Sequence, residues 1–599
     1  MTYAAPLDDM RFVLNRLAGL PEIATLPGFE DANPELVEAI LIEAGRFAGE
    51  VLAPLNSTGD RQGCRWFDGK VATPDGFPAA YQQFIEGGWH SMPASTDIGG
   101  QGMPALVSSA VAEIWKSANL AFSLCQMLTM GAVEALVNHA SDTLKQRFLP
   151  KMVAGEWTGT MNLTEPQAGS DLSAVRTRAE PDGDHYRLSG SKIFITWGEH
   201  DVAENVIHLV LARLPDAPEG TRGISLFVAP KFLVNPDGSL GARNDLVCAS
   251  IEHKLGIHGS PTAVMSYGDK EGAVGYLVGE PNRGLEYMFT MMNHARLNVG
   301  LEGVAVSEAA YQHAVAYARG RVQGKPIGGA ERDPIIYHPD VRRMLMDMRA
   351  RTEAMRALAY CTAACMDRAR HHPDPAVRAP NQGRVELLTP VVKGWCTESS
   401  ILIASTGIQV HGGMGYVEET GAAQYLRDAR ITTIYEGTTG IQANDLLGRK
   451  LVRDKGLNAG ALIRDMTAEL DALALTNDAD LSAIASAFKA ARGAFEEATA
   501  WLLARYDSDP REAVAGAVPY LKLTGIVVGG WHMAHAARIA RDLLSAGRRT
   551  PPFCTPRSPP HASTPSTYCR RPPHHGTKSR LALARRWRWR RRHSNFACT

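Results

Sequence analysis

Two changes of hydrophobic period divide this chain and limit the folds open to it. Apolar residues recur at helical spacing over residues 104–155. Between about 157 and 278 the pattern becomes short β-branched runs, such as YRLSGSKIFIT, NVIHLVLARL and RGISLFVAP, bounded by Gly, Pro and Asp. Helical spacing returns at Gly284 and continues to about residue 448. These separate helical and β blocks predict an α+β multi-domain fold, because a doubly wound sheet would need strands and helices in alternation.

The chain is too long, at 599 residues, for a single hydrophobic core, so several packed units are expected. In the last helical block, Phe488, Phe495 and Leu502 recur at heptad-like spacing and should face a core. The expected units are an N-terminal extension (1–34), a helical domain (35–156), a β domain (157–278), a second helical domain with the candidate base (279–450), a further helical domain (457–547) and a tail (548–599).

The clearest single helix covers residues 34–52. Asn33 can cap its first turn, and Pro34 suits the first helical position, where a backbone N–H has no partner. The apolar residues of this segment should form one core-facing stripe: Leu36, Val37, Ile40, Leu41, Ala44, Phe47, Ala48 and Val51.

The formal net charge of zero conceals two parts of different sign. Residues 548–599 contain 13 of the 63 Lys and Arg and no Asp or Glu, which leaves 50 basic and 63 acidic residues, a net of −13, in residues 1–547. The tail also holds 8 of the 35 prolines and 3 of the 9 cysteines and lacks periodicity, so it should be disordered.

Two interpretations fit this basic tail. Its interleaved Arg and Trp suit an arm that binds nucleic acid or a membrane. Alternatively the tail is a frameshifted end, since the composition changes abruptly within a good helical pattern, GGWHMAHAARIARDLLSAG. We favour the frameshift.

No segment predicts secretion or a membrane span. The N-terminus MTYAAPLDDMRFVLNRL has two early acids and no apolar core of signal-peptide type, and no window approaches 18 consecutive apolar residues. The cysteines form no CxxC pair and no His/Cys cluster at metal-ligand spacing. We therefore expect a cytoplasmic protein with no metal site.

Three stretches suit a ligand, although each is ambiguous alone. In MNLTEPQAGSD (161–171), a small-residue turn can wrap a polar ring or phosphate, or simply cap the entry to the β domain. In GSKIFIT (190–196), Phe194 and Thr196 share one face of a strand, which fits a flat heterocycle or ordinary core packing. In GIQVHGGMGYVEE (407–419), glycines allow close backbone approach, but no strand precedes them as a nicotinamide fingerprint requires.

A fourth stretch, RDARITTIYEGTTGIQANDLLGRK (427–450), sets the carboxylate of Glu436 in a largely apolar context. The four stretches, in this order, resemble the acyl-CoA dehydrogenase family over about residues 35–450. LTEPQAGSD resembles its first flavin signature, FIT its Trp-Ile-Thr stretch, HKLGIHGSPT (253–262) its Lys-Leu-Gly-x-Arg-x-Ser segment, and IQVHGGMGY and YEGTTGIQ its two C-terminal signatures. The start YAAPLDDMRFVL, the ending NDLLGRK and the block at 457–547 resemble the long subgroup that includes 3-methylmercaptopropionyl-CoA dehydrogenases.

The resemblance implies that family's fold and activity. The fold would be an N-terminal helical domain, a β-barrel-like middle domain and a four-helix bundle, with an extra C-terminal helical domain. The activity would be FAD-dependent oxidation of an acyl-CoA thioester to the trans-2-enoyl-CoA, in which Glu436 removes the α-proton and the β-hydrogen leaves as hydride to flavin N5. The α-proton of a thioester is only weakly acidic, so its removal needs a close base in a dry pocket. Desolvation in such a pocket should raise the pKa of Glu436. The backbone N–H of the base and a flavin hydroxyl would hold the developing negative charge.

The resemblance also implies individual contacts. The FAD contacts would be Leu163, Thr164, Gly169, Ser170, Phe194, Thr196 and Thr438, and the substrate contacts Ser170, Asn293, Arg296 and Gly437. A neighbouring subunit's FAD would be reached by Arg321, Gln409, Gly412 and Gly413, which requires a homo-oligomer, dimer or tetramer. The implied electron acceptor is an electron-transfer flavoprotein, and methylmercaptopropionyl, short-chain and medium-chain acyl groups all stay open.

Several positions depart from the family pattern. Phe194 replaces its usual indole, Asn293 its Asp or Glu near CoA, and His258 its usual Arg. The segment RGRVQGK is one residue shorter than the usual Arg-x-x-Phe-Gly form, which puts Gln323 as an FAD contact in doubt. None of these changes removes the base.

Two rival functions use the same scaffold. An acyl-CoA oxidase-like flavoenzyme would use dioxygen, and rapid reoxidation of its reduced flavin in air would reveal it. A DNA-binding flavoprotein would use the basic tail, but the acidic body opposes binding to phosphates, so nucleic acid is not an expected partner.

Deleting residues 548–599 should leave flavin binding and activity intact, because this tail has no core-forming pattern. Flavin absorbance per chain and turnover, compared between the full chain and the shortened one, test this. Loss of FAD on truncation would contradict the expectation, and salt-dependent DNA binding that survives the deletion would restore the DNA-binding interpretation.

Overall fold

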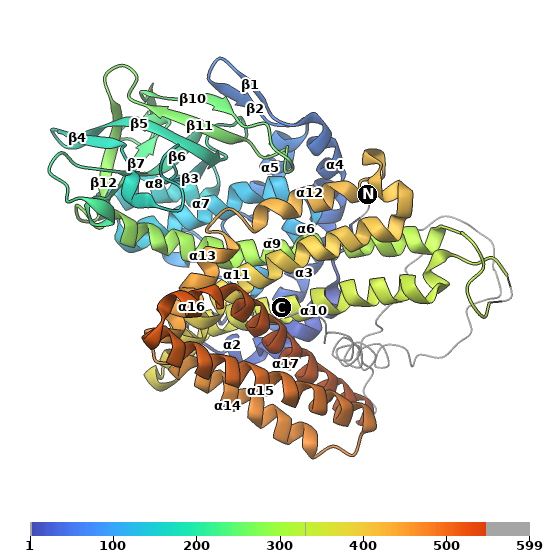
Figure 1. Ribbon diagram of the computed structural model, residues 1–599. Helices are drawn as coiled ribbons and strands as arrows, with labels where there is room; N and C mark the ends of the chain where they lie inside the picture. The colour runs from blue at the N-terminus through green and yellow to red at the C-terminus, as the bar shows by residue number, and fades with distance from the viewer. Residues whose placement is uncertain (1–2, 330, 547–599) are drawn as a thin grey trace.

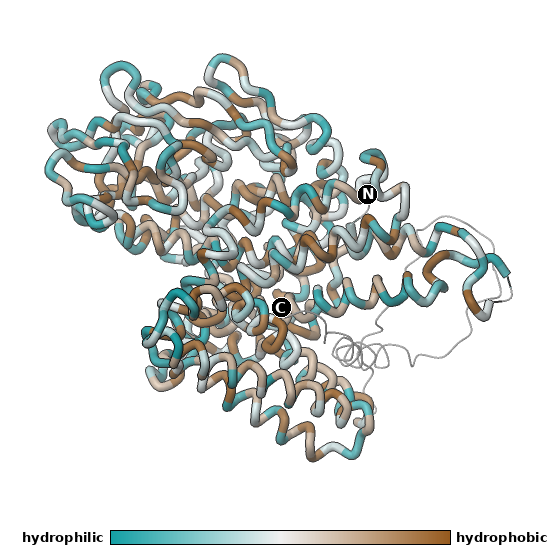
Figure 2. Tube along the Cα trace, viewed as in Figure 1, coloured by the Kyte–Doolittle hydropathy of each residue, from teal (hydrophilic) through white to brown (hydrophobic). Residues whose placement is uncertain are grey.

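The computed structural model describes residues 3–329 and 331–546. A β-sheet domain occupies one end of the molecule, long helices cross the centre, and a separate group of helices lies at the opposite end (Figure 1). Helices and strands are thus segregated in layers, which confirms the predicted α+β class. Hydrophilic residues are concentrated at the hairpin tips of the sheet domain and at the outer loops (Figure 2). The basic tail lies outside the described residues.

The first helical layer is built from short N-terminal helices and three longer ones under the sheet. Its elements are α1 (Leu7–Phe12), η1 (Val13–Ala18), α2 (Leu20–Ile23), α3 (Pro34–Phe47), η2 (Ala48–Leu52), α4 (Ala53–Gln62), β1 (Arg65–Phe67), β2 (Lys70–Ala72), α5 (Phe77–Glu86), η3 (Thr96–Ile98), α6 (Ala105–Ala118), α7 (Leu120–His139) and α8 (Asp142–Ala154).

The predicted helix at 34–52 is present and continues through the π-helical turn η2 into α4. The Asn33 side chain accepts a hydrogen bond from the Leu36 N–H at 2.8 Å, which confirms the cap. Leu36 itself is 37% exposed, so its predicted place in the core stripe is wrong. The buried stripe is centred on Val37, Leu41 and Ala44, and Leu36 lies at its outermost edge on the helix surface.

The sheet domain confirms the three predicted strands. Its strands are β3 (Trp157–Asn162), β4 (Arg178–Asp182), β5 (His185–Thr196), β6 (Asn205–Ala212), β7 (Ser225–Pro230), β8 (Phe232–Val234), β9 (Leu240–Arg243), β10 (Leu246–Ile251), β11 (Thr262–Tyr267) and β12 (Ala273–Val278), with η4 (Leu172–Ala174) and η5 (Gly220–Gly223) between strands. The main sheet has the order β10-β11-β5-β12-β7-β6-β3, with β4 paired to β5. All its pairs are antiparallel except β3 with β6.

Both faces of strand β6, which lies between β7 and β3, are buried. Leu209 and Leu211 belong to the core shared with the helices, whereas Val210 and Ala212 belong to a second core inside the curled sheet. This arrangement explains why NVIHLVLA reads as a continuous apolar run and not as a strict alternation.

The second helical layer contains the longest helices of the chain. Its elements are α9 (Gly284–Gly320), η6 (Ile335–Tyr337), α10 (Pro339–His371), α11 (Pro375–His411), η7 (Gly412–Tyr416), η8 (Glu418–Thr420), α12 (Ala422–Thr432), α13 (Thr439–Asn444) and η9 (Asp445–Val452). The N-terminal segment is tied to α10 by two arginines, since Arg368 donates to the Ala18 carbonyl at 3.0 Å and Arg349 pairs with Asp9 at 3.3 Å.

One helix among the described residues, α7, is long and apolar enough to span a membrane, but 83% of its most apolar window is buried inside the protein. This burial is the pattern of a core helix. Helix α7 runs between the sheet and the long helices of the second layer (Figure 1).

The last helical group consists of α14 (Leu457–Ala474), α15 (Ala479–Ser508), α16 (Pro510–Ala515) and α17 (Ala517–Ser545). Phe488, Phe495 and Leu502 are at most 3% exposed on α15, which confirms their predicted core position. The group docks on the second layer through α17, where Gly525 accommodates the Trp395 ring of α11: a Cβ at Gly525 would lie 2.2 Å from the Trp395 Cγ.

Two matched glycine substitutions test this docking. Gly525→Ala should lower the free energy of unfolding by about 1–3 kcal/mol, because the added methyl overpacks the contact with Trp395. Gly493→Ala, on α15 with no other atom within 4 Å of the added methyl, should raise it by about 0.5–1 kcal/mol through helix propensity. Denaturant unfolding of both variants compares them, and a Gly525→Ala protein as stable as the Gly493→Ala protein would contradict the close contact.

Candidate active site

Glu436 lies in a short turn between α12 and α13 that adopts a left-handed backbone conformation. The φ angle is +54° at Glu436 and +87° at Gly437. A non-glycine residue in this region costs about 1–3 kcal/mol, so the surrounding structure must hold it there. The Thr438 hydroxyl accepts from the Ile441 N–H at 3.3 Å and so caps α13 immediately after the turn.

Side chains from three helices hold the turn from its buried side. Lys393 of α11 donates from Nζ to the Gly437 carbonyl at 2.7 Å. Gln442 of α13 donates from Nε2 to the carbonyls of Glu436 at 3.1 Å and Gly437 at 3.2 Å. The Tyr435 hydroxyl donates to Glu302 of α9. The carbonyls are therefore directed inward, and the N–H groups of Glu436 and Gly437 find no acceptor among the described residues.

The Glu436 carboxyl keeps some contact with solvent, but protein atoms crowd it closely. Burial raises the pKa of Glu436 to about 7, with a smaller contribution from the Glu302 carboxylate. Arg296 and Lys393 act in the opposite sense, because their positive charges favour the ionised form. A carboxylate with a pKa near neutrality can accept a proton efficiently at physiological pH.

The groups around Glu436 are themselves buried and charged. Burial lowers the pKa of Lys393 to about 8, although the Glu436 and Glu302 carboxylates favour its charged form. Burial also raises the pKa of Glu302, whose carboxylate lies 3.9 Å from the Lys116 ammonium. Two carboxylates thus share one region with three cations, Lys116, Arg296 and Lys393, which limits the cost of burying each charge.

Arg296 and Asn293 lie on one turn of α9 beside this region. The Arg296 Nη1 pairs with Asp445 at 3.4 Å and lies 3.4 Å from the Asn293 Oδ1. Arg296 is only 5% exposed, yet its Nε has no hydrogen-bond partner in the described part of the chain. A buried donor without a partner is costly, so this side chain suits a polar ligand.

A second group of predicted residues lies at the end of β3 and on β5. The Ile193 N–H donates to the Thr164 carbonyl at 2.9 Å, which sets β5 against the segment that leaves β3. A bulge opposite β11 leaves Phe194 at φ +60° and 58% exposed. Thr196 is partly exposed and Ile195 between them is buried, so Phe194 and Thr196 share the outer face.

The turn of LTEPQAGSD is built around one buried acid. Glu165 pairs with Lys192 at 2.8 Å and accepts from the Thr177 hydroxyl at 2.6 Å and the Arg176 N–H at 2.7 Å. These bonds, with the Lys192 ammonium and despite burial, lower the pKa of Glu165 to about 2. The chain then emerges at the surface, where Gly169 and Ser170 are exposed and a Cβ at Gly169 would meet no atom within 4 Å.

Contacts of α12 bring the two groups to the same region. The Asp428 carboxylate of α12 accepts from the Ile257 N–H at 2.6 Å, in the loop between β10 and β11. Directly after this loop, β11 pairs Thr262 with Thr196. The sheet edge with Phe194 and the turn with Glu436 therefore flank the junction of the sheet and helical layers (Figure 1).

The third group of predicted residues lies far from the other two within one chain. Arg321 follows α9 directly, and the rings of Tyr317 and His411, 4.3 Å apart, place it beside the exposed Gln409, Gly412 and Gly413 at the end of α11. Along α9, 25 residues separate this end from Arg296, which corresponds to about 37 Å at the rise of an α-helix. This group therefore lies at the C-terminal end of α9, well away from Arg296.

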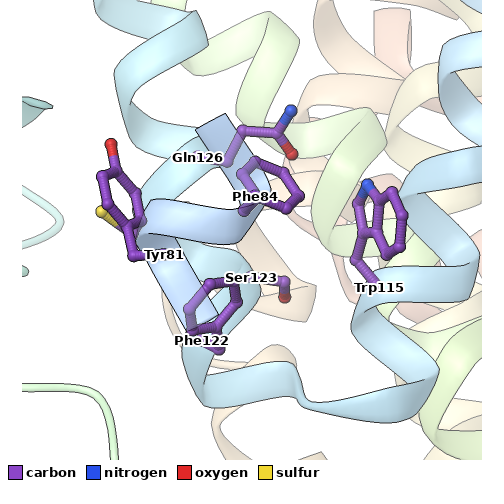
Figure 3. A pocket seen from close by; sticks show the side chains of 7 residues that line it. Tyr81, Phe84, Trp115, Phe122, Ser123 and Gln126 are labelled. Atoms are coloured by element: carbon purple, nitrogen blue, oxygen red, sulfur yellow. The ribbon is translucent and has the colours of Figure 1, made fainter. Parts of the chain in front are cut away.

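An apolar gap in the first helical layer is a different feature. Figure 3 shows it between the aromatic rings of Tyr81, Phe84, Trp115 and Phe122, beside Ser123, Cys125 and Gln126. Its empty space of about 220 Å³ has no room for the centre of a water molecule, so it is a packing gap between α5, α6 and α7.

Comparison with known proteins decides the family. Four family models match successive parts of the chain: acyl-CoA dehydrogenase N-terminal domain (residues 35–156), middle domain (160–269) and C-terminal domain (282–451), and acetyl-CoA dehydrogenase C-terminal like (462–557). The chain belongs to the acyl-CoA dehydrogenase family. Members of this family are flavin-dependent oxidoreductases of acyl-CoA.

Individual members of the family show which relatives this chain resembles. The chain is 50% identical to 3-methylmercaptopropionyl-CoA dehydrogenase of Ruegeria pomeroyi, over 91% of this chain and 93% of that protein. It is 37% identical to a butyryl-CoA dehydrogenase of Syntrophomonas wolfei, over 76% of each. Among solved structures, ACDH-11 of Caenorhabditis elegans in complex with C11-CoA has a TM-score of 0.74 at 20% identity, covering 98% of this chain and 92% of that one, and shows the shared fold.

The structure adds site residues that sequence reasoning missed: Glu165, Lys192, Glu302 and Lys393. Lys192 lies inside a strand, and Glu302 and Lys393 lie inside helices, among many apolar residues, which is the signal that could have found them, since a buried charge must be paired. Glu165 lies in a turn and gives no such signal. His258, where the family has Arg, bonds Asp60 at 3.0 Å, and the same carboxylate pairs with Arg427 at 2.6 Å. Asp60 therefore still pairs with a guanidinium, that of Arg427.

The raised pKa of Glu436 predicts a stability effect with a definite sign. The folded chain binds this proton more tightly than the unfolded chain, so ionisation of Glu436 costs stability progressively between pH 4.5 and about 7 and fully above that range. Glu436→Gln removes the cost. The free energy of unfolding of the variant should rise relative to that of the unmodified protein across this pH range, by at most about 3 kcal/mol. Above the range, the difference between the two proteins should stay constant.

Unfolding curves at pH 5, 6, 7 and 8 measure this difference. Glu398→Gln is the matched control, because Glu398 is an exposed carboxylate that accepts from the hydroxyl of Thr439 near the same turn at 2.7 Å. A difference between Glu436→Gln and the unmodified protein that does not change with pH would show that Glu436 is not desolvated.

Proposed function

We propose that this protein is an FAD-dependent acyl-CoA dehydrogenase in which Glu436 removes the α-proton of an acyl-CoA thioester. The single observation that carries the proposal is the Glu436 carboxyl: it is desolvated to a pKa of about 7 and held in a left-handed turn whose own N–H groups find no acceptor in the part of the chain that the structure describes. Such a base is costly to build, and the family's reaction needs one.

The residues of the sheet edge fit a flavin. Phe194 offers an exposed phenyl face, and Thr164, Ser170 and Thr196 offer hydroxyl groups along the same edge. A flat polar heterocycle takes an aromatic face on one side and hydrogen-bond donors at its rim. We assign Leu163, Thr164, Gly169, Ser170, Phe194, Thr196 and Thr438 to FAD, which when bound supplies the acceptor for the β-hydride.

The residues of α9 and the turn fit the substrate. We assign Asn293 and Arg296 to the CoA portion because Arg296 keeps a buried donor without a partner. Ser170 is assigned to CoA as well as to FAD, and the Gly437 position to the thioester. The free N–H of Glu436 would hold negative charge on the thioester oxygen as the α-proton moves to the Glu436 carboxylate.

The proton that Glu436 removes would leave its C–H electron pair at the α-carbon to form the new C=C bond. The β-hydrogen would leave with its own electron pair, for which bound FAD would supply the acceptor. Tyr435, whose hydroxyl donates to Glu302, and Glu302 itself lie near Glu436. Exclusion of water by the bound acyl group strengthens each of these interactions.

We infer a homo-oligomer from the place of the third group of residues. Arg321, Gln409, Gly412 and Gly413 lie at the C-terminal ends of α9 and α11, away from Arg296, and we assign them to the FAD of a second subunit. Exposed apolar side chains at the same end, Met414, Tyr416 and Val417, suit burial against another copy. A cytoplasmic location and an electron-transfer flavoprotein as electron acceptor complete the proposal.

The acyl group is proposed from the relatives. The 50% identity to a 3-methylmercaptopropionyl-CoA dehydrogenase and the 37% identity to a butyryl-CoA dehydrogenase favour a short acyl group of about four or five chain atoms beyond the thioester sulfur, with or without a thioether. Longer straight chains are the alternative that a substrate panel separates.

The proposal predicts anaerobic bleaching of the flavin band by acyl-CoA. The purified protein should bleach with 3-methylmercaptopropionyl-CoA or butyryl-CoA, and Glu436→Gln should retain flavin while losing about 10²–10⁴-fold in rate, because the general base is gone. Stopped-flow absorbance with a panel of chain lengths measures both. Normal bleaching by Glu436→Gln would refute the base, no bleaching by any acyl-CoA would refute the reaction, and rapid reoxidation in air would indicate an oxidase.

A further inference from the structure

Lys393 is a buried ammonium directly beneath the turn that carries Glu436. It is 0% exposed and stands in α11 among buried residues, with Val391 and Val392 before it and Trp395 after it. An ammonium in such surroundings is costly unless it is bonded. Its hydrogen bond goes to a main-chain carbonyl, that of Gly437, at 2.7 Å and not to a carboxylate. The Lys393 ammonium therefore binds the backbone of the turn and not an acidic side chain.

The turn needs such support because two consecutive residues are left-handed. Glu436 at φ +54° would relax toward the right-handed region if its peptide groups were free to rotate. Rotation of the peptide between Gly437 and Thr438 would break the bond from Lys393, and rotation of the peptide between Glu436 and Gly437 would break a bond from Gln442. The two donors hold successive carbonyls in one direction.

The support is itself rigid. The residues next to Lys393 on α11 pack against α17: a Cβ at Gly394 would lie 2.8 Å from Leu521, and the Trp395 ring contacts Gly525 and Gly529 closely. The last helical group thus packs against the segment of α11 that carries the Lys393 ammonium. A lysine on a braced helix fixes position better than one on a loop.

We propose that Lys393 is a positioning residue, which holds the 435–438 turn through the Gly437 carbonyl and so keeps the Glu436 carboxylate in its reactive orientation. This inference rests on the proposed role of Glu436 as the base. Gln442 acts with Lys393 as the second donor, without a charge.

The charged and titratable groups that act on Glu436 are Arg296 and Glu302 of α9, Lys393 of α11 and the neighbouring Tyr435. Behind them lie the partners of those groups: Lys116 of α6 beside Glu302, Glu398 of α11 beside Lys393, Asp428 of α12 beside Tyr435, and Asp445 of η9 beside Arg296. Of these groups, Arg296 and Lys393 favour the ionised form of Glu436 and Glu302 disfavours it. Removing the Lys393 charge should therefore move the titration of the base to higher pH.

Three variants of the full-length holoenzyme test the proposal. Lys393→Met should retain flavin, lower kcat by about 10–100-fold with KM changed less than about threefold, and shift the rising limb of kcat against pH upward. Lys393→Arg, which keeps the charge, should leave that limb in place. Gln442→Met removes the neutral donor, so it should lower kcat without moving the limb. The matched control is Lys450→Met, a lysine paired with Glu386 at 3.5 Å on the bundle surface, which should behave as the unmodified protein.

The outcomes separate this inference from the proposed function. An unchanged kcat and an unchanged pH profile in Lys393→Met would overturn the inference about Lys393. The role of Glu436 as the base is tested separately, by comparing Glu436→Gln with the unmodified protein in the same assay. If Lys393→Met does not fold, Gln442→Met decides, and an unchanged kcat there would overturn the inference. A lowered kcat with no shift of the pH limb in Lys393→Met would also overturn it, because a merely structural loss leaves the titration where it was.

Discussion

The desolvation of one carboxylate is the constraint on which this site depends. Protein atoms displace water from Glu436, and that displacement raises its pKa to about 7, as the proposed base requires. The same desolvation would disfavour the charge if nothing compensated it. Arg296 and Lys393 supply the compensation, and Lys116 pairs with the neighbouring Glu302, so the site requires the first and second helical layers to be packed together.

The sheet domain depends on a comparable buried pair. Glu165 and Lys192 lie at 2.8 Å, and Glu165 also takes the N–H groups of Arg176 and Thr177. This pair fastens the LTEPQAGSD turn to β5 and leaves the chain exposed from Gly169 onward. The ligand edge that we propose thus lies in a segment fastened by an ion pair as well as by the buried apolar residues Leu163, Ala168 and Val175.

The last helical group has a role beyond enlarging the core. Its helix α17 meets α11 where Gly394 and Trp395 lie beside Lys393, so its docking stiffens the helix that supports the turn. The far ends of α9 and α11 carry the other exposed residues of the family signatures. Those residues lie about 37 Å from Arg296 along α9, which is why we propose that they belong to the site of a second subunit.

Sequence alone determined the class of the fold and singled out Glu436 as the proposed base. The change from helical period to short β-branched runs predicted the sheet at the right strands, the Asn33 cap and the inward face of Phe495 were readable from local pattern, and the carboxylate in YEGTTG stood out by its apolar context. Such features depend on neighbours within a few residues. The stripe prediction placed Leu36 in the core wrongly, because local spacing does not define where a partner helix ends. Tertiary structure alone decided that Lys393, Glu302 and Gln442 surround the turn, since these residues come from separate helices and only packing brings their charges and donors to one carboxylate.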